Sequence, residues 1–169
     1  CCAGSRLLVH EPVAAAFHTK VKARLDRLRI GDPMDKSIDV GAIVDPIQHA
    51  AITRMVNANT DGETYVTAAE IPATGCFYPP TLITGLSPSA TLMQEEIFGP
   101  VVCVIGFDTE EEAIAIANDG QCGKTEYTAA LDYFGNPVHL NQFFDQSLFA
   151  NFFGIRHLKL QSTFSSSVG

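Results

Sequence analysis

The chain contains 169 residues, of which 46% are hydrophobic and 18% are charged. This composition is ordinary for a soluble globular protein, and the length suits one domain or part of a larger one. The formal net charge is −8, which argues against binding to a nucleic-acid backbone, because such binding needs a basic face. No apolar run is long enough to cross a bilayer. We therefore expect neither a nucleic-acid partner nor a membrane partner.

The first predicted elements are a strand and an amphipathic helix. Arg6–His10 reads as a short strand, and Pro12 stands where a helix can begin. We expect Gly31, which precedes an Asp-Pro pair, to cap this helix. Apolar residues recur at intervals of three and four, as in a helix that packs on a sheet: Val13, Phe17, Val21, Leu25 and Leu28.

A second helix is predicted to begin at Pro46 and to end near Asn59. After it, residues 65–67 and 77–83 have extended character. The apolar face of this helix is predicted to contain Ile47, Ala51, Met55 and Val56.

A buried strand and a capped helix follow. Residues 101–105 form a mostly β-branched run, typical of a strand buried on both faces of a parallel sheet. Asp108 and Thr109 then cap a helix that carries three glutamates in its first turn. The alternation of strands and helices along the chain indicates an α/β fold.

The character of the sequence changes near Gly120. Nine of the fifteen phenylalanines and tyrosines lie from this point onward, without the spacing of a helix or a strand. The charge changes as well, because the whole net charge of −8 lies before residue 120. We therefore divide the chain into a globular part, 1–119, and a divergent tail, 120–169.

Cysteine usage indicates a reducing, cytoplasmic setting. The five cysteines are odd in number, and their spacing fits neither a zinc site nor a small disulfide framework. The five histidines have no metal-ligand spacing either, so no metal site is expected. Cys76 and Cys103 are expected to be buried structural thiols.

Two short motifs contain candidate functional residues. In the first, Cys1 opens a run of small residues just before the first predicted strand, which suits a nucleophile at a strand entrance. Taken alone, Cys1 is more simply a small adaptable residue near a terminus. The second motif is Glu95–Val101. Within it, Glu96 alone would be a solvated acid and Phe98 alone a core residue.

Together, the two motifs resemble those of the aldehyde dehydrogenase superfamily. Cys1–Arg6 is similar to the stretch that begins with the catalytic cysteine, and Glu95–Val101 is similar to the cofactor-side motif. The sequence of residues 29–37 resembles that of the family-16 branch. The resemblance covers the chain to about Asp119. It implies a partial aldehyde dehydrogenase catalytic domain with an open, mostly parallel sheet and flanking helices.

The resemblance also implies roles for three residues. Cys1 would attack an aldehyde to form a thiohemiacetal, hydride transfer to NAD or NADP would leave a thioester, and water would release the carboxylic acid. Glu96 would hold the hydroxyls of the nicotinamide-side ribose, and Phe98 would pack beside the nicotinamide. The substrate would be a small-molecule aldehyde, and the parent protein would be a homo-oligomer.

The chain lacks an initiator methionine and begins at the cysteine of the first motif, so we expect a fragment of a longer enzyme. In the family, the general-base glutamate, the oxyanion-hole asparagine and the main dinucleotide fold all precede this cysteine. We therefore expect the fragment alone to be inactive. The alternative is a non-catalytic pseudoenzyme or interaction module derived from the same fold.

Overall fold

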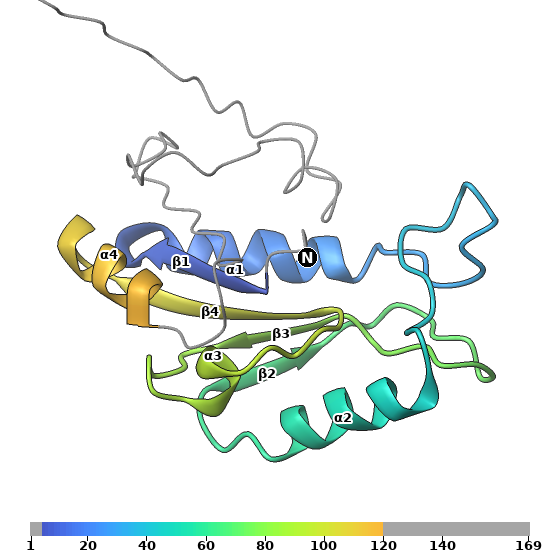
Figure 1. Cartoon of the computed structure of the whole chain (residues 1–169). Coiled ribbons are helices and arrows are strands. Elements are labelled where there is room, and N and C mark those ends of the chain that lie inside the picture. The colour runs from blue at the N-terminus through green and yellow to red at the C-terminus, as the bar shows by residue number, and fades with distance from the viewer. Residues whose placement is uncertain (1–4, 120–169) are drawn as a thin grey trace, which may run out of the picture.

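A computed structural model describes residues 5–119 of the chain. Their centre is a four-stranded sheet with the order β1-β4-β3-β2 (Figure 1). The strands span Arg6–His10 (β1), Glu63–Val66 (β2), Thr81–Thr84 (β3) and Val101–Phe107 (β4).

The sheet is mostly parallel. β4 pairs in parallel with β1 on one side and with β3 on the other, whereas β2 is antiparallel to β3 at an edge. In the register, Cys103 of β4 lies between Arg6 of β1 and Ile83 of β3. With the helices that flank it, this sheet confirms the predicted fold class, a partial α/β domain.

Helix α1 (Glu11–Leu25) covers one face of the sheet. The predicted cap at Gly31 is wrong, because the helix ends at Leu25 and Asp26 is its C-cap residue. Contacts with a distant segment accompany this earlier end: the Thr67 hydroxyl donates to the Leu25 carbonyl (2.8 Å), and the Asp26 carboxylate accepts from the Ala68 amide (2.8 Å). These contacts hold the end of α1 against the segment that follows β2.

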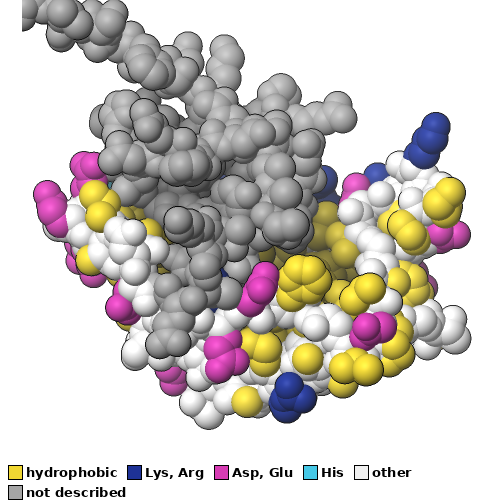
Figure 2. Space-filling model, viewed as in Figure 1, with side chains coloured by type: hydrophobic (Ala, Val, Ile, Leu, Met, Phe, Trp, Pro, Cys, Tyr) yellow, Lys and Arg dark blue, Asp and Glu magenta, His cyan; other side chains and the backbone are white. Residues whose placement is uncertain are grey.

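Helix α2 (Pro46–Asn57) lies against the opposite face. Its boundaries agree with the prediction, but its predicted apolar face is wrong in part. Ile52 is fully buried, whereas Ile47 is 81% exposed. The exposed residues Val44 and Met34 come from the loop before α2, and Figure 2 shows apolar side chains gathered over this region of the surface.

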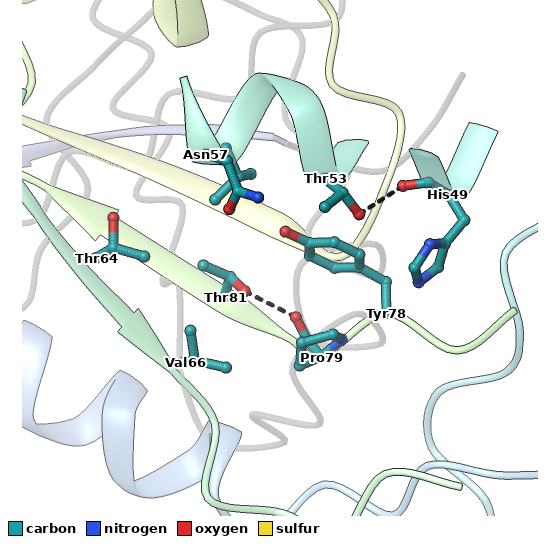
Figure 3. A pocket seen from close by; sticks show the side chains of 9 residues that line it. His49, Thr53, Asn57, Thr64, Val66, Tyr78, Pro79 and Thr81 are labelled. Carbon is teal, nitrogen blue, oxygen red and sulfur yellow. Dashed lines mark hydrogen bonds between the residues drawn. The ribbon is translucent and has the colours of Figure 1, made fainter. Parts of the chain in front are cut away.

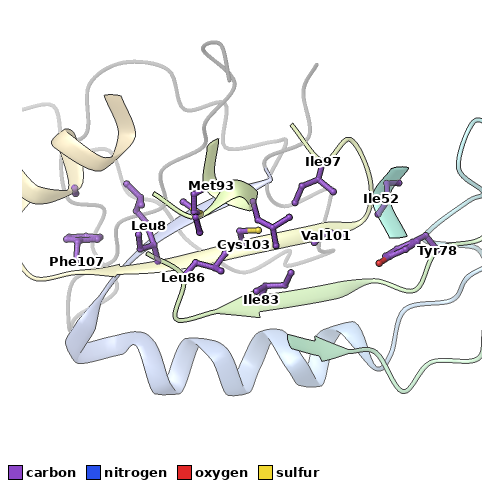
Figure 4. Packing of buried hydrophobic residues seen from close by; sticks show 14 residues of the cluster. Leu8, Ile52, Tyr78, Ile83, Leu86, Met93, Ile97, Val101, Cys103 and Phe107 are labelled. Carbon is purple, nitrogen blue, oxygen red and sulfur yellow. The ribbon is translucent and has the colours of Figure 1, made fainter. Parts of the chain in front are cut away.

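The same face of the sheet also carries α3 (Thr91–Gln94) and α4 (Glu110–Asp119). Alternate residues of β4 point to the two faces, so Val102 and Val104 pack with α1 while Cys103 and Ile105 pack with the other helices. Burial of β4 on both faces was predicted and is confirmed. Figure 4 shows the larger cluster, in which Ile52 of α2 and Met93 of α3 lie against the sheet.

Candidate active site

The turn Glu95–Gly99 connects α3 to β4 and carries both predicted cofactor-side residues. Glu96 and Phe98 are exposed, and 59% of the surface of Phe98 is accessible. Phe98 has a φ of +53° and is the only non-glycine residue with a positive φ among residues 5–119. A left-handed backbone is unfavourable for an aromatic residue. The surroundings must therefore hold Phe98 in place, and an exposed, strained aromatic residue points to a functional role.

The start of β1 is tied to this turn. Arg6 is buried, and its Nη2 donates a hydrogen bond to the carbonyl of Glu95 (2.7 Å). One residue earlier, the carbonyl of Ser5 accepts from the amide of Cys103 in β4 (2.8 Å). The point where the chain enters β1 therefore lies beside the Glu95–Gly99 turn.

The first turn of α2 holds the other side of the Glu95–Gly99 turn. The Asp45 carboxylate accepts from the amide of Gln48 (2.7 Å) and caps α2. The side-chain nitrogen of Gln48 then donates to the carbonyls of Ile97 (3.1 Å) and Phe98 (3.2 Å). Two main-chain carbonyls of the turn are thus bound by one side chain.

Packing fixes the end of the turn. A β-carbon added to Gly99 would overlap the Cδ1 atom of Ile52 and lie 3.0 Å from its Cγ1 atom. Because Ile52 is fully buried, it has little room to move. Gly99 therefore lets the end of the turn and α2 approach more closely than any larger residue would allow.

The predicted nucleophile, Cys1, lies outside the described residues, as does Cys2. Cys103 is fully buried, and burial raises the pKa of its thiol to about 12, so this thiol is not a nucleophile near neutral pH. Its predicted burial is confirmed. Cys76 is only half-buried, so the same prediction is wrong for Cys76.

A hollow of about 480 Å³ lies between α2 and the strands β2 and β3 (Figure 3). Two threonine hydroxyls in its lining are bonded to nearby main chain: Thr53 donates to the His49 carbonyl and Thr81 to the Pro79 carbonyl, both at 2.8 Å. Burial raises the pKa of Tyr78 in the same lining. The hollow contains none of the predicted site residues.

Sequence reasoning missed Gln48 and Arg6. One signal for Gln48 was present, because Asp45 and Gln48 stand at the spacing of a capping box, D-x-x-Q. That pattern predicts the cap, but it does not predict that the glutamine side chain bonds a turn elsewhere in the chain. No sequence signal pointed to the Arg6 contact.

The model of the aldehyde dehydrogenase family matches residues 1–133 of the chain. The chain belongs to the aldehyde dehydrogenase family. It is 38% identical over 123 residues to the peroxisomal aminoaldehyde dehydrogenase 2 of Pisum sativum, covering 70% of this chain. It is 37% identical over 133 residues to the aminoacetaldehyde dehydrogenase of Pseudomonas aeruginosa, covering 78% of this chain.

Solved aldehyde dehydrogenases share the fold. A betaine aldehyde dehydrogenase from Staphylococcus aureus in complex with NAD+ matches 71% of this chain with 32% identity and a TM-score of 0.64. The matches cover only 24% of the pea enzyme, 27% of the Pseudomonas enzyme and 25% of the Staphylococcus chain, so this aldehyde dehydrogenase chain spans about a quarter of their length. The family match extends past Asp119. The domain boundary there and the family-16 branch both stay predictions.

Proposed function

We propose that this chain supplies the nucleophilic thiol and the nicotinamide-side wall of an NAD(P)-dependent aldehyde dehydrogenase, which oxidises a small-molecule aldehyde to its carboxylic acid. The observation that carries the proposal is the exposed Phe98, held at a φ of +53° two residues after the exposed Glu96. Such strain at a surface is expected where a ligand needs a fixed aromatic face.

The chain connectivity supports a site shared by Cys1 and Phe98. β1 and β4 are neighbouring parallel strands, so the segments that precede them start from the same edge of the sheet. Cys1 is four residues before Ser5, and four residues of extended chain reach at most about 14 Å. This connectivity allows the Cys1 thiol to reach the Glu95–Gly99 turn, and it supports the proposed shared site.

Glu96 and Phe98 fit the cofactor that the family implies. A carboxylate accepts hydrogen bonds from two neighbouring hydroxyls, as on a ribose, and a fixed aromatic ring restricts the position of a flat ring beside it. The cofactor, when bound, would accept the hydride released from the substrate carbon. Cys1 would form the bond to the aldehyde carbon, keep the acyl group as a thioester and regain its thiol when water hydrolyses that thioester.

The remaining catalytic parts would come from segments that this chain does not include. The resemblance assigns the general base, the oxyanion-hole asparagine and the main dinucleotide fold to residues before the catalytic cysteine. We therefore propose that these 169 residues alone do not oxidise aldehydes. For the parent protein we propose a cytoplasmic homo-oligomer.

The test is a graft. Residues 1–119 replace the corresponding stretch of the Pseudomonas aeruginosa aminoacetaldehyde dehydrogenase, and NADH formation from NAD+ and aminoacetaldehyde is measured. We expect activity in the graft, none in its Cys1→Ala variant, and none in the isolated chain. A second graft that carries only residues 1–10 and 95–107 covers the case in which the first is not folded.

Size-exclusion chromatography and circular dichroism establish that each graft is folded. A folded graft without NADH formation would contradict the proposal and favour the non-catalytic alternative. NADH formation by the isolated chain above its Cys1→Ala control would contradict the expectation that it is inactive by itself.

A further inference from the structure

We propose that Gln48 is a positioning residue, which holds the backbone of Phe98 in its left-handed conformation and thereby sets the affinity for the cofactor. The proposal rests on the function proposed above, because it takes Phe98 as the cofactor-side surface. Gln48 itself is assigned no contact with substrate or cofactor.

The two hydrogen bonds of Gln48 fall on the two peptide groups that flank Phe98. The Ile97 carbonyl belongs to the peptide group before the Phe98 α-carbon, and the Phe98 carbonyl belongs to the one after it. Gln48 donates to these carbonyls at 3.1 Å and 3.2 Å from one nitrogen, and a side-chain amide has two N–H donors. Because φ and ψ rotate these two peptide planes about the α-carbon, fixing both planes fixes both dihedral angles of Phe98.

The side chain of Gln48 is available for this role because the α2 cap does not use it. At the third position of a helix, a Gln or Glu side chain commonly reaches back to the residue at the helix start. At α4, the Glu112 side chain likewise reaches back and accepts from the amide of Asp108 (2.8 Å), the residue before Thr109, whose hydroxyl accepts from the Glu112 amide (3.2 Å). In α2, Asp45 caps the helix through the Gln48 amide, and the Gln48 side chain points instead to a turn 49 residues away.

Packing alone does not account for the conformation of Phe98. The Ile52–Gly99 contact brings α2 close to the turn, but apolar packing has no preferred orientation for a peptide plane. The Arg6 hydrogen bond acts on Glu95, three residues before Phe98. Without Gln48, these two contacts would keep the turn near α2 and near the start of β1, while the Phe98 backbone relaxes toward an ordinary conformation.

The first experiment measures the turn directly. Hydrogen exchange of the full chain is followed by mass spectrometry in the peptide that covers Glu95–Val101, for the parent chain and for Gln48→Met. Methionine keeps the length of the side chain and removes both donors. The matched control is Asn59→Asp, which removes another side-chain amide donor from a main-chain carbonyl, that of Asp61 (2.6 Å).

We expect exchange in this peptide to become about tenfold faster in Gln48→Met, as for the loss of two hydrogen bonds. Exchange in Asn59→Asp should equal that of the parent chain. Equal exchange in Gln48→Met and the parent chain would overturn the positioning role.

The second experiment uses the graft that carries residues 1–119, because the smaller graft includes neither Gln48 nor Asn59. We expect Gln48→Met to raise the KM for NAD+ about tenfold, with the KM for the aldehyde unchanged and kcat within about a factor of two. A merely structural role would lower the amount of active enzyme without this separation of the two KM values. Asn59→Asp should change neither KM.

The two experiments separate failure of this inference from failure of the proposed function. Faster exchange with an unchanged KM for NAD+ would overturn the link between the turn and the cofactor, and with it the role proposed for Phe98. A folded but inactive graft would contradict the proposed function, while the exchange measurement would still decide whether Gln48 holds the turn.

Discussion

The contact between Gly99 and Ile52 gives the sharpest prediction about packing around the site. Gly99→Ala adds one methyl group where the Cδ1 atom of Ile52 already lies. The backbone of Gly99 does not have a positive φ, so alanine meets no backbone strain there. Any loss of stability must come from the overlap with Ile52.

The size of the effect follows from the two neighbours. Overpacking by one methyl group in a closed core costs about 1–3 kcal/mol, and the reduced freedom of the unfolded chain returns about 0.4–1 kcal/mol. We therefore expect Gly99→Ala to lower the free energy of unfolding by about 1–2 kcal/mol. Ile52→Val removes the Cδ1 atom, and on its own it should cost about 0.5–1.5 kcal/mol.

In the Ile52→Val background the overlapping Cδ1 atom is absent. The remaining close approach to Cγ1 is then offset by the reduced freedom of the unfolded chain, so Gly99→Ala should change the free energy of unfolding by less than about 0.5 kcal/mol. The coupling between the two substitutions should then be about 1 kcal/mol or more. The assay is urea unfolding of the four chains, followed by circular dichroism. Additive effects of the two substitutions would refute the reasoning, because they would show that Gly99 and Ile52 do not compete for the same space.

Two further predictions concern turns and pH. Gly62 and Gly85 both have a φ of +72°, but of these two only Gly62 would place an added β-carbon on a main-chain atom, the carbonyl oxygen of Thr84. Gly62→Ala should therefore lower the urea midpoint of unfolding more than Gly85→Ala does. Equal losses in the two variants would contradict the overlap. Burial lowers the pKa of His18 from 6.5, so the folded chain resists its protonation and stability is lost as the pH falls below 6.5. The thermal midpoint should fall less between pH 7.5 and about pH 5 in His18→Gln than in the parent chain, and parallel curves would exclude His18 as the cause.

Elements that depend on local pattern were predictable from the sequence. The strand at Arg6–His10 and the boundaries of α2 follow from apolar runs and from Pro46. The end of α1 could not be predicted from Gly31, because the helix ends earlier. There, Thr67 and Ala68 of a distant segment form hydrogen bonds with Leu25 and Asp26. A glycine marks a possible cap, whereas the actual cap depends on what the helix end contacts.

The candidate site shows the same limit. Glu96 and Phe98 could be found because they lie within one continuous motif. Gln48 and Arg6 could not, since they contact the Glu95–Gly99 turn from 49 and 89 residues away. Short motifs therefore predict the residues that face a ligand better than the residues that hold them in position.

The parallel pairing of β1 with β4 also limits where this chain can change in length. Arg6 pairs with Cys103, and a shift of this pairing by two residues would move one strand along the other by about 6.6 Å. An insertion within either strand would therefore alter the spacing between the start of β1 and the Glu95–Gly99 turn. An insertion in the loop between α1 and α2 would leave the pairing unchanged, so length differences among related chains should accumulate in such loops.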